Sequence, residues 1–361
     1  MKDKKQNKRI NGGHRLLFFC ILCLFGLYVA VSYAEEQPQR EQSKTKVILL
    51  HTDNLTYDQY RHPGAQILTG NVQFQHDGVL MYCDSACFYE ATNSFDAFGH
   101  VKMVQGDTLD LVGDMLLYNG LDQLARVRHN VVLTHRESKL YTDSLDYDRL
   151  YELGYFFEGG KLVDKDNVLT SDWGQYSPPT RQAVFNYNVK LENPKFTLIS
   201  DTLNYNTLTS MAEIVGPSNI DSGDNHIYSE SGFYNTQTEE AILLDRSIVT
   251  NKGRKMVGDS LYYDSKSGVG EGFRNVVYTD EVNKNMLTGN YCYYNDSTGY
   301  SMATDSAVAI DYSQRDTMYM HADTFKVYTF YMDTDSMYRE VRGYHKVRSY
   351  RMDVQSVCDS L

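Results

Sequence analysis

The sequence has few of the residues that covalently hold small secreted folds together. It contains 6 cysteines in 361 residues, and two of them, Cys20 and Cys23, lie in an apolar stretch near the N-terminus. Cys83 and Cys87 are four residues apart on a predicted strand, about 13 Å, whereas a disulfide needs Cα atoms within about 7 Å. A disulfide framework is therefore excluded, and the core and the sheet must hold the chain together.

Catalytic and cofactor motifs are missing as well. No nucleophile elbow, phosphate loop or dinucleotide fingerprint occurs in the sequence. The histidines are scattered, and none of them lie at the spacing of a metal motif. We therefore expect no cofactor and no metal ion, and we expect a protein that is not an enzyme.

Positive charge is scarce. The chain has 35 Lys and Arg against 47 Asp and Glu, a net charge of −12. Its first 34 residues carry six basic residues and one acid, so the remainder has a net charge of −17. This balance argues against nucleic acid and against an anionic membrane surface as partners. It also leaves little to bind phosphates.

Helical periodicity is absent beyond the N-terminal stretch. A basic start precedes an apolar run from Leu16 to Val31, and Ser32-Tyr33-Ala34 then offers a small-x-small cleavage site. This is the pattern of a secretory signal peptide, and the alternative is an uncleaved membrane anchor. We expect a signal peptide over residues 1–34, a short linker over 35–44, a single repeat domain over 45–361, and a location outside the cytoplasm.

What the sequence does contain is a regular ladder of acidic and aromatic residues. An acidic or amide residue recurs with an aromatic or apolar partner four residues later, and the intervals between copies are 31, 30, 29, 29, 29, 29, 29, 31 and 33 residues. The first members are Asp53, Asp84, Asp114, Asp143, Asp172, Asp201, Glu230, Asp259, Asn290 and Asp323. The partners are Tyr57, Phe88, Tyr118, Tyr147, Tyr176, Tyr205, Tyr234, Tyr263, Tyr294 and Val327. A fixed period of this size indicates a stacked repeat architecture.

The repeat has the period of a strand. Positions two and four after each acid are apolar and the positions between them mostly polar, as in DSLDY at Asp143, which predicts half-buried strands. A second strand follows, marked by GNV at Gly70, GHV at Gly99 and HNV at His129. We therefore predict an all-β fold, an elongated, solenoid-like β-jellyroll built from about ten copies of a two-strand unit of about 29 residues.

The combination of these two boxes resembles a known family. LTGNV at Leu68, VGDMLLY at Val112, YTDSLDY at Tyr141, ISDTLNY at Ile199 and VGDSLYY at Val257 are similar to the OstA-like proteins, relatives of the LptA-type periplasmic carriers of lipopolysaccharide. The resemblance covers roughly residues 45–361. It implies a twisted β-jellyroll folded like a taco, with lipid A acyl chains in an apolar groove and no catalytic residues. It also implies partners, either other lipopolysaccharide-transport components or further copies joined head to tail through sheet edges, that form a bridge toward the outer membrane.

The sequence departs from the family pattern in places. The last two intervals are longer, and Gly174 and Gly232 stand where the repeat usually has Leu. No segment resembles the outer-membrane barrel of the translocon subunit. Cys358-Asp359-Ser360-Leu361 repeats the start of the box, so we expect the domain to end mid-repeat, with missing sequence beyond it or a partner at its edge.

The apolar columns are the candidate lipid-binding residues. If they line a groove between two facing sheets, the residues that contact acyl chains are Leu116, Tyr118, Leu145, Tyr147, Leu203, Tyr205, Leu261 and Tyr263. The alternative is that these side chains fill a dry core, as in a structural or adhesive β-solenoid. A third interpretation, a polysaccharide-active enzyme, needs one distinctive carboxylate pair, whereas here an acid recurs in every repeat. We expect the acids to lie near strand bends and to accept backbone N–H groups.

Overall fold

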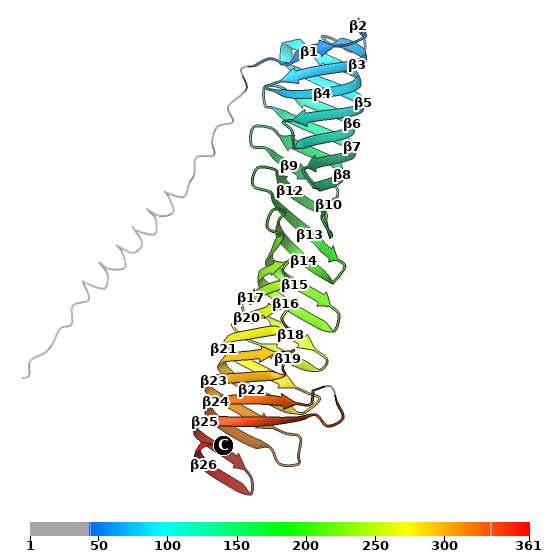
Figure 1. Ribbon diagram of the computed structural model, residues 1–361. Coiled ribbons are helices and arrows are strands. Elements are labelled where there is room, and N and C mark those ends of the chain that lie inside the picture. Colours follow the sequence, from blue (N-terminus) through cyan, green and yellow to red (C-terminus); the bar gives the residue numbers. More distant parts are fainter. Residues whose placement is uncertain (1–42, 44, 333) are drawn as a thin grey trace, which may run out of the picture. The chain divides into compact units, whose positions relative to one another are not determined.

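The computed structural model describes residues 43, 45–332 and 334–361 (Figure 1). These belong to one compact unit, Ser43–Leu361. The predicted signal peptide and most of the predicted linker lie outside the described residues. Among the residues described, no helix is long and apolar enough to cross a membrane.

The described chain is one antiparallel sheet. Its first strands are β1 (Ile48–His51), β2 (Asn54–Thr56), β3 (Gln66–His76), β4 (Val79–Tyr89), β5 (Ser94–Gln105), β6 (Leu109–Asn119), β7 (Leu124–His135), β8 (Ser138–Asp148), β9 (Leu153–Phe156), β10 (Gly160–Asp164), β11 (Asn167–Ser171), β12 (Trp173–Ser177) and β13 (Gln182–Asn193). The remaining strands are β14 (Phe196–Asn206), β15 (Met211–Ser222), β16 (Asn225–Asn235), β17 (Glu240–Leu244), β18 (Ile248–Asn251), β19 (Arg254–Val257), β20 (Ser260–Asp264), β21 (Val269–Asp280), β22 (Asn285–Asn295), β23 (Tyr300–Asp311), β24 (Met318–Phe330), β25 (Tyr338–Arg351) and β26 (Val354–Ser360). One short 3-10 helix, η1 (Glu90–Thr92), links β4 and β5. The predicted all-β class is confirmed.

Most long strands pair with the next strand in the sequence, so the strands follow one another along the sheet in chain order (Figure 1). Each long strand also carries an irregularity near its middle. Between β5 and β6, Phe98 pairs with Met115 and Val101 with Gly113, so Gly99 and His100 together lie opposite the single residue Asp114. Such a two-against-one bulge bends a strand.

The bulges recur at the acidic residues of the ladder. In β7, His129 and Asn130 have φ values of 62° and 53° and lie opposite Asp143. The same arrangement places Asp84, Asp201, Glu230, Asn290, Asp323 and Asp359 opposite a two-residue bulge. We call this line of bends the crease. In two regions, Leu153–Ser177 and Glu240–Asp264, the crease interrupts the strands altogether, which explains the short strands β9–β12 and β17–β20.

The crease divides the sheet into two halves that face each other. We call the strand halves that follow the acids, such as Met115–Asn119 of β6, together with the strand halves that pair with them, the aromatic leaf. The halves that precede the acids, such as Leu109–Val112, form the facing leaf with their own paired strand halves. Phe74 of the facing leaf stacks on Phe95 of the aromatic leaf with ring centroids 4.1 Å apart. The two leaves therefore pack directly against each other, as a sheet folded along its crease.

The apolar side chains between the leaves form two clusters. The larger one runs from Val47 to Leu261 and includes Phe, Tyr, Leu and Met side chains. The smaller one is Val276, Cys292, Ala303, Ala307, Ala322, Phe325 and Val347. Alanine makes up three of these seven residues, so the interior beyond Leu261 is built from smaller side chains. Met256, Leu287 and Met320 are only partly buried against it.

The four described cysteines are free, and Cys83 and Cys87 do not pair with each other, as their spacing predicted. Burial raises the pKa of the Cys83 and Cys292 thiols to about 12. These thiols are therefore inert, apolar members of the packed interior.

Candidate functional site

The eight predicted groove residues lie on the inner face of the aromatic leaf. Seven of them, all except Tyr263, are at most 2% exposed and belong to the larger apolar cluster. Tyr263 is half-buried, at the margin where that cluster ends. The structure thus brings the predicted column together, and between the two leaves these side chains are closely covered.

At the edge opposite the crease, hydrogen bonds between polar side chains join the two leaves. The hydroxyl oxygen of Tyr118 lies 2.7 Å from Nδ1 of His76, and that of Tyr176 lies 2.8 Å from Nδ1 of His135. Tyr205 donates its hydroxyl to Asp164 at 2.8 Å. In each pair a tyrosine of the aromatic leaf meets a residue at the end of a facing-leaf strand, 41 or 42 positions earlier in the sequence. We call this row of hydrogen bonds the seam.

The seam contains a buried cation at its first rung. Arg149, which lies in the turn after β8, donates to the hydroxyl of Tyr118 and to the backbone carbonyl of His76, the latter at 3.1 Å. Because a guanidinium only donates, the Tyr118 oxygen accepts from Arg149 and its own proton is free to reach Nδ1 of His76. Burial raises the pKa of Tyr118. The hydroxyl therefore stays neutral and works as both donor and acceptor.

One rung of the seam is not closed. Tyr147 and Gln105 stand in the same relation, 42 positions apart, but the Tyr147 hydroxyl and the Gln105 Oε1 atom are both buried without a hydrogen-bond partner. The Gln105 amide instead donates to Glu152 at 2.6 Å. Burial raises the pKa of Tyr147, with the charge of Glu152 adding to the effect. Two unpaired buried polar atoms make this rung the weakest part of the seam.

The acidic ladder lies outside the interior, along the crease. Asp114 accepts from the side-chain amide of Asn130 at 2.6 Å, and Asp172 accepts from that of Asn188 at the same distance. Similar bonds join Asn71 to Asp53, His100 to Asp84 and Asn275 to Asp259. The predicted location near strand bends is therefore correct. The main donors, however, are side chains of the bulge residues rather than backbone groups.

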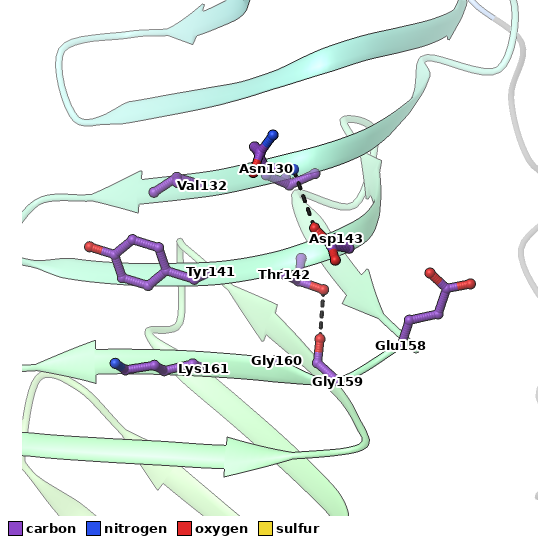
Figure 2. A pocket seen from close by; sticks show the side chains of 10 residues that line it. Asn130, Val132, Tyr141, Thr142, Asp143, Glu158, Gly159, Gly160 and Lys161 are labelled. Atoms are coloured by element: carbon purple, nitrogen blue, oxygen red, sulfur yellow. Dashed lines mark hydrogen bonds between the residues drawn. The ribbon is translucent and has the colours of Figure 1, made fainter.

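A pocket also lies at the crease. It has a volume of about 530 Å³ and contains two carboxylates, Asp143 in β8 and Glu158 before β10 (Figure 2). Asp143 accepts the backbone N–H of Asn130 at 3.3 Å, and Glu158 accepts the hydroxyl of Ser144 at 2.6 Å. Figure 2 shows Thr142 donating to the carbonyl of Gly159 between them, at 2.7 Å. The carboxylates and the threonine of this pocket thus form hydrogen bonds that stabilise the strand bend.

Sequence reasoning did not identify the seam partners His76, His135 and Asp164. The sequence does contain a pattern that could have identified them: each is a polar residue at a strand end, 41 or 42 positions before an aromatic residue of the ladder. No cluster of three or more His, Cys, Asp or Glu side chains that could hold a metal ion occurs within the described residues.

Comparison with known proteins identifies the family. A family model described as OstA-like protein matches residues 44–201 and 197–259. No match was found among curated proteins. Among solved structures, the chain is similar to LptH of Pseudomonas aeruginosa, described as the LptA homologous periplasmic component of the conserved lipopolysaccharide transport device, with 17% identity, a TM-score of 0.26, and coverage of 27% of this chain and 75% of that chain. Because the family model spans more than half of the sequence, this chain belongs to the OstA-like protein family.

Proposed function

We propose that this chain is a non-catalytic periplasmic lipid-binding protein that carries or bridges lipopolysaccharide toward the outer membrane. Its membership of the OstA-like family supports this role. The observation that carries this proposal is the apolar cluster that runs between the two leaves from Val47 to Leu261, with long strands that pass from one leaf to the other at the crease. At the opposite edge the leaves meet through side-chain hydrogen bonds, which can open without unfolding the sheet.

Acyl chains would lie along the column of Leu116, Tyr118, Leu145, Tyr147, Leu203, Tyr205, Leu261 and Tyr263. Each buried CH₂ group contributes about 0.8 kcal/mol, so a few acyl chains can offset the seam hydrogen bonds that separate on opening. The smaller C-terminal cluster suits the first contact, because Met256 and Met320 are partly exposed and methionine adapts to irregular apolar partners. No chemistry is required, since transfer follows mass action between neighbouring sites.

We also propose that the carrier acts with partners. The candidates are other lipopolysaccharide-transport components or further copies of this chain, joined head to tail through sheet edges. In the described part of the chain β26 pairs with β25 alone, and its other edge is a template for an added strand. Secretion by a cleaved signal peptide over residues 1–34 would bring the protein to the periplasm, and an uncleaved N-terminal anchor would place it there too.

Site-specific photo-crosslinking in cells tests the lipid-binding proposal. A crosslinker at Tyr205 or Tyr147, on the inner face, should capture lipopolysaccharide. A crosslinker at Tyr141, which is exposed on β8, is the matched control and should not. Failure to capture lipid from either inner position would contradict the carrier.

The close packing of the interior favours a second candidate, a structural or adhesive β-solenoid without a lipid cavity. Leu203 and Tyr205, for example, are fully buried. Mass spectrometry of organic extracts from the purified protein separates the two functions. Stoichiometric copurified lipid supports the carrier, and its absence supports the solenoid.

A further inference from the structure

A pocket straddles the seam between the rung of Tyr176 with His135 and the rung of Tyr205 with Asp164. It has a volume of about 290 Å³. Arg136 and Lys165 enter it from two successive turns of the facing leaf, after β7 and β10, and Arg181 enters from the turn of the aromatic leaf before β13. The pocket thus lies at the opening between the leaves, directly over the tyrosine column.

None of the three cations forms an ion pair with a carboxylate in the part of the chain that the structure describes. Lys165 donates to the Ser210 hydroxyl at 3.0 Å. In the part of the chain that the structure describes, the side chains of Arg136 and Arg181 make neither an ion pair nor a hydrogen bond, unlike Arg128, which pairs with Asp146 at 2.7 Å. The guanidinium groups of the pocket are therefore available to a ligand.

The two carboxylates of the pocket do not neutralise these groups. Asp164 is 1% exposed and accepts hydrogen bonds from Tyr205 and from Ser138, each at 2.8 Å. It faces the seam beneath the pocket. Glu137 is exposed at the rim. Three cations against two carboxylates leave the pocket with a positive balance, in a chain whose net charge is −12.

The two arginines act on the same rung of the seam from opposite leaves. Burial lowers the pKa of His135, and the charges of Arg136 and Arg181 lower it further. Both arginines also act on Tyr176, the partner of His135. Because Arg136 and Arg181 line the same pocket from opposite leaves, both guanidinium groups can contact one ligand in it. Guanidinium forks match phosphate oxygens in bidentate geometry.

We propose that this pocket is a phosphate-binding site, which takes a phosphomonoester or a pyrophosphate on Arg136, Arg181 and Lys165. The source that the geometry favours is the phosphorylated headgroup of a lipid whose acyl chains lie between the leaves below. The phosphate site stands on the pocket itself, and only the identification of its source rests on the proposed lipid-carrier function. The site provides a local exception to the acidity of the chain, which otherwise disfavours phosphates.

The site is tested with the full-length protein by calorimetric titration of pyrophosphate at low salt. The Arg136→Gln/Arg181→Gln double variant should weaken binding about tenfold or more, because two charge-assisted bonds are lost. Lys165→Gln is a second variant, with a smaller expected loss. Its charge-matched control is Arg315→Gln, in the exposed loop before β24, which should bind as wild type does. Wild-type protein that does not bind pyrophosphate, or a double variant with wild-type affinity, would overturn the site.

The source is tested with hexa-acylated lipid A and with the same lipid after enzymatic removal of its phosphates. We expect the double variant to bind phosphorylated lipid A about tenfold more weakly and to bind the dephosphorylated lipid as wild type does. If pyrophosphate binds through the arginines but neither lipid binds, the phosphate site stands with a free anion as its ligand, and the lipid-carrier function fails. If lipid A binds equally well to wild type and double variant, the carrier stands and the headgroup assignment is overturned.

Discussion

The side-chain amide of Asn130 in β7 donates to the carboxylate of Asp114 in β6 at 2.6 Å, where these two neighbouring strands bend at the crease. Asn130 itself has a φ of 53°, in the left-handed region that asparagine tolerates better than most residues. The two residues stand 16 positions apart, as do Asp84 and His100, Asp172 and Asn188, and Asp259 and Asn275. Asn130 therefore contributes twice: its backbone adopts the conformation that the bend requires, and its side chain hydrogen-bonds to the preceding strand.

Replacing Asn130 separates these two contributions. Asn130→Gly removes the amide but keeps a residue that adopts positive φ freely, so it should lower the free energy of unfolding by about 1 kcal/mol. Asn130→Ala also loses the backbone compatibility, and we expect a further loss of about 1 kcal/mol. Urea denaturation followed by circular dichroism measures both. Equal stability of the two variants would show that the backbone conformation at this bend carries no cost.

Tyr147 and Tyr205 are both buried tyrosines of the column, but their hydroxyl groups should contribute differently to stability. Tyr147→Phe deletes a buried hydroxyl that has no partner, so stability should be unchanged or slightly higher. Tyr205→Phe deletes a hydroxyl that donates to Asp164 and accepts from Asn167, and it should cost about 1–3 kcal/mol. Thermal melts of the two variants side by side provide the measurement. A Tyr147→Phe loss as large as that of Tyr205→Phe would mean that Tyr147 has a partner in solution.

Much of the fold was predictable because its information is local. Alternation after Asp143 and Asp201 identifies which side chains share a face, and the fixed interval identifies stacked strands. The motif GHV at Gly99 was also recognisable in the sequence, but the reason for its glycine was not. Gly99 has a φ of 76°, and a Cβ there would collide with the carboxylate of Asp84.

The state of the interior was not predictable in the same way. Strand periodicity assigns Tyr205 and Leu203 to the inner face but carries no information on the distance between the two leaves. That distance depends on pairs such as Phe74 and Phe95, and on seam contacts such as Tyr205 with Asp164, which join residues from different repeats. A pattern read one repeat at a time does not contain them.

A charge placed on the inner face should distinguish the packed interior from the outer surface. Leu203→Asp puts a carboxylate where no water or partner is available, so we expect a loss of several kcal/mol in the free energy of unfolding or a raised carboxyl pKa. Ile199→Asp is the control on the same strand, since Ile199 is 51% exposed on the outer face, and it should change stability little.

Lipid extraction adds a second readout to this pair of variants. A Leu203→Asp protein that folds normally but no longer copurifies with lipid would indicate an interior that opens to admit both water and acyl chains. Unchanged lipid in that variant would contradict lipid binding at the Leu203 column.

The seam should weaken under mild acid, and the sign follows from its histidines. Burial lowers the pKa of both His76 and His135 below the ordinary value near 6.5, so the unfolded chain takes up these protons more readily than the folded one. Stability is therefore fully present above about pH 6.5 and is lost as the pH falls from there toward the folded pKa. Thermal melts between about pH 7.5 and 5.5 should show this loss, and His135→Gln, whose amide does not titrate, should reduce it. An unchanged pH slope in that variant, and in the His76→Gln/His135→Gln double variant, would place the acid sensitivity outside the seam.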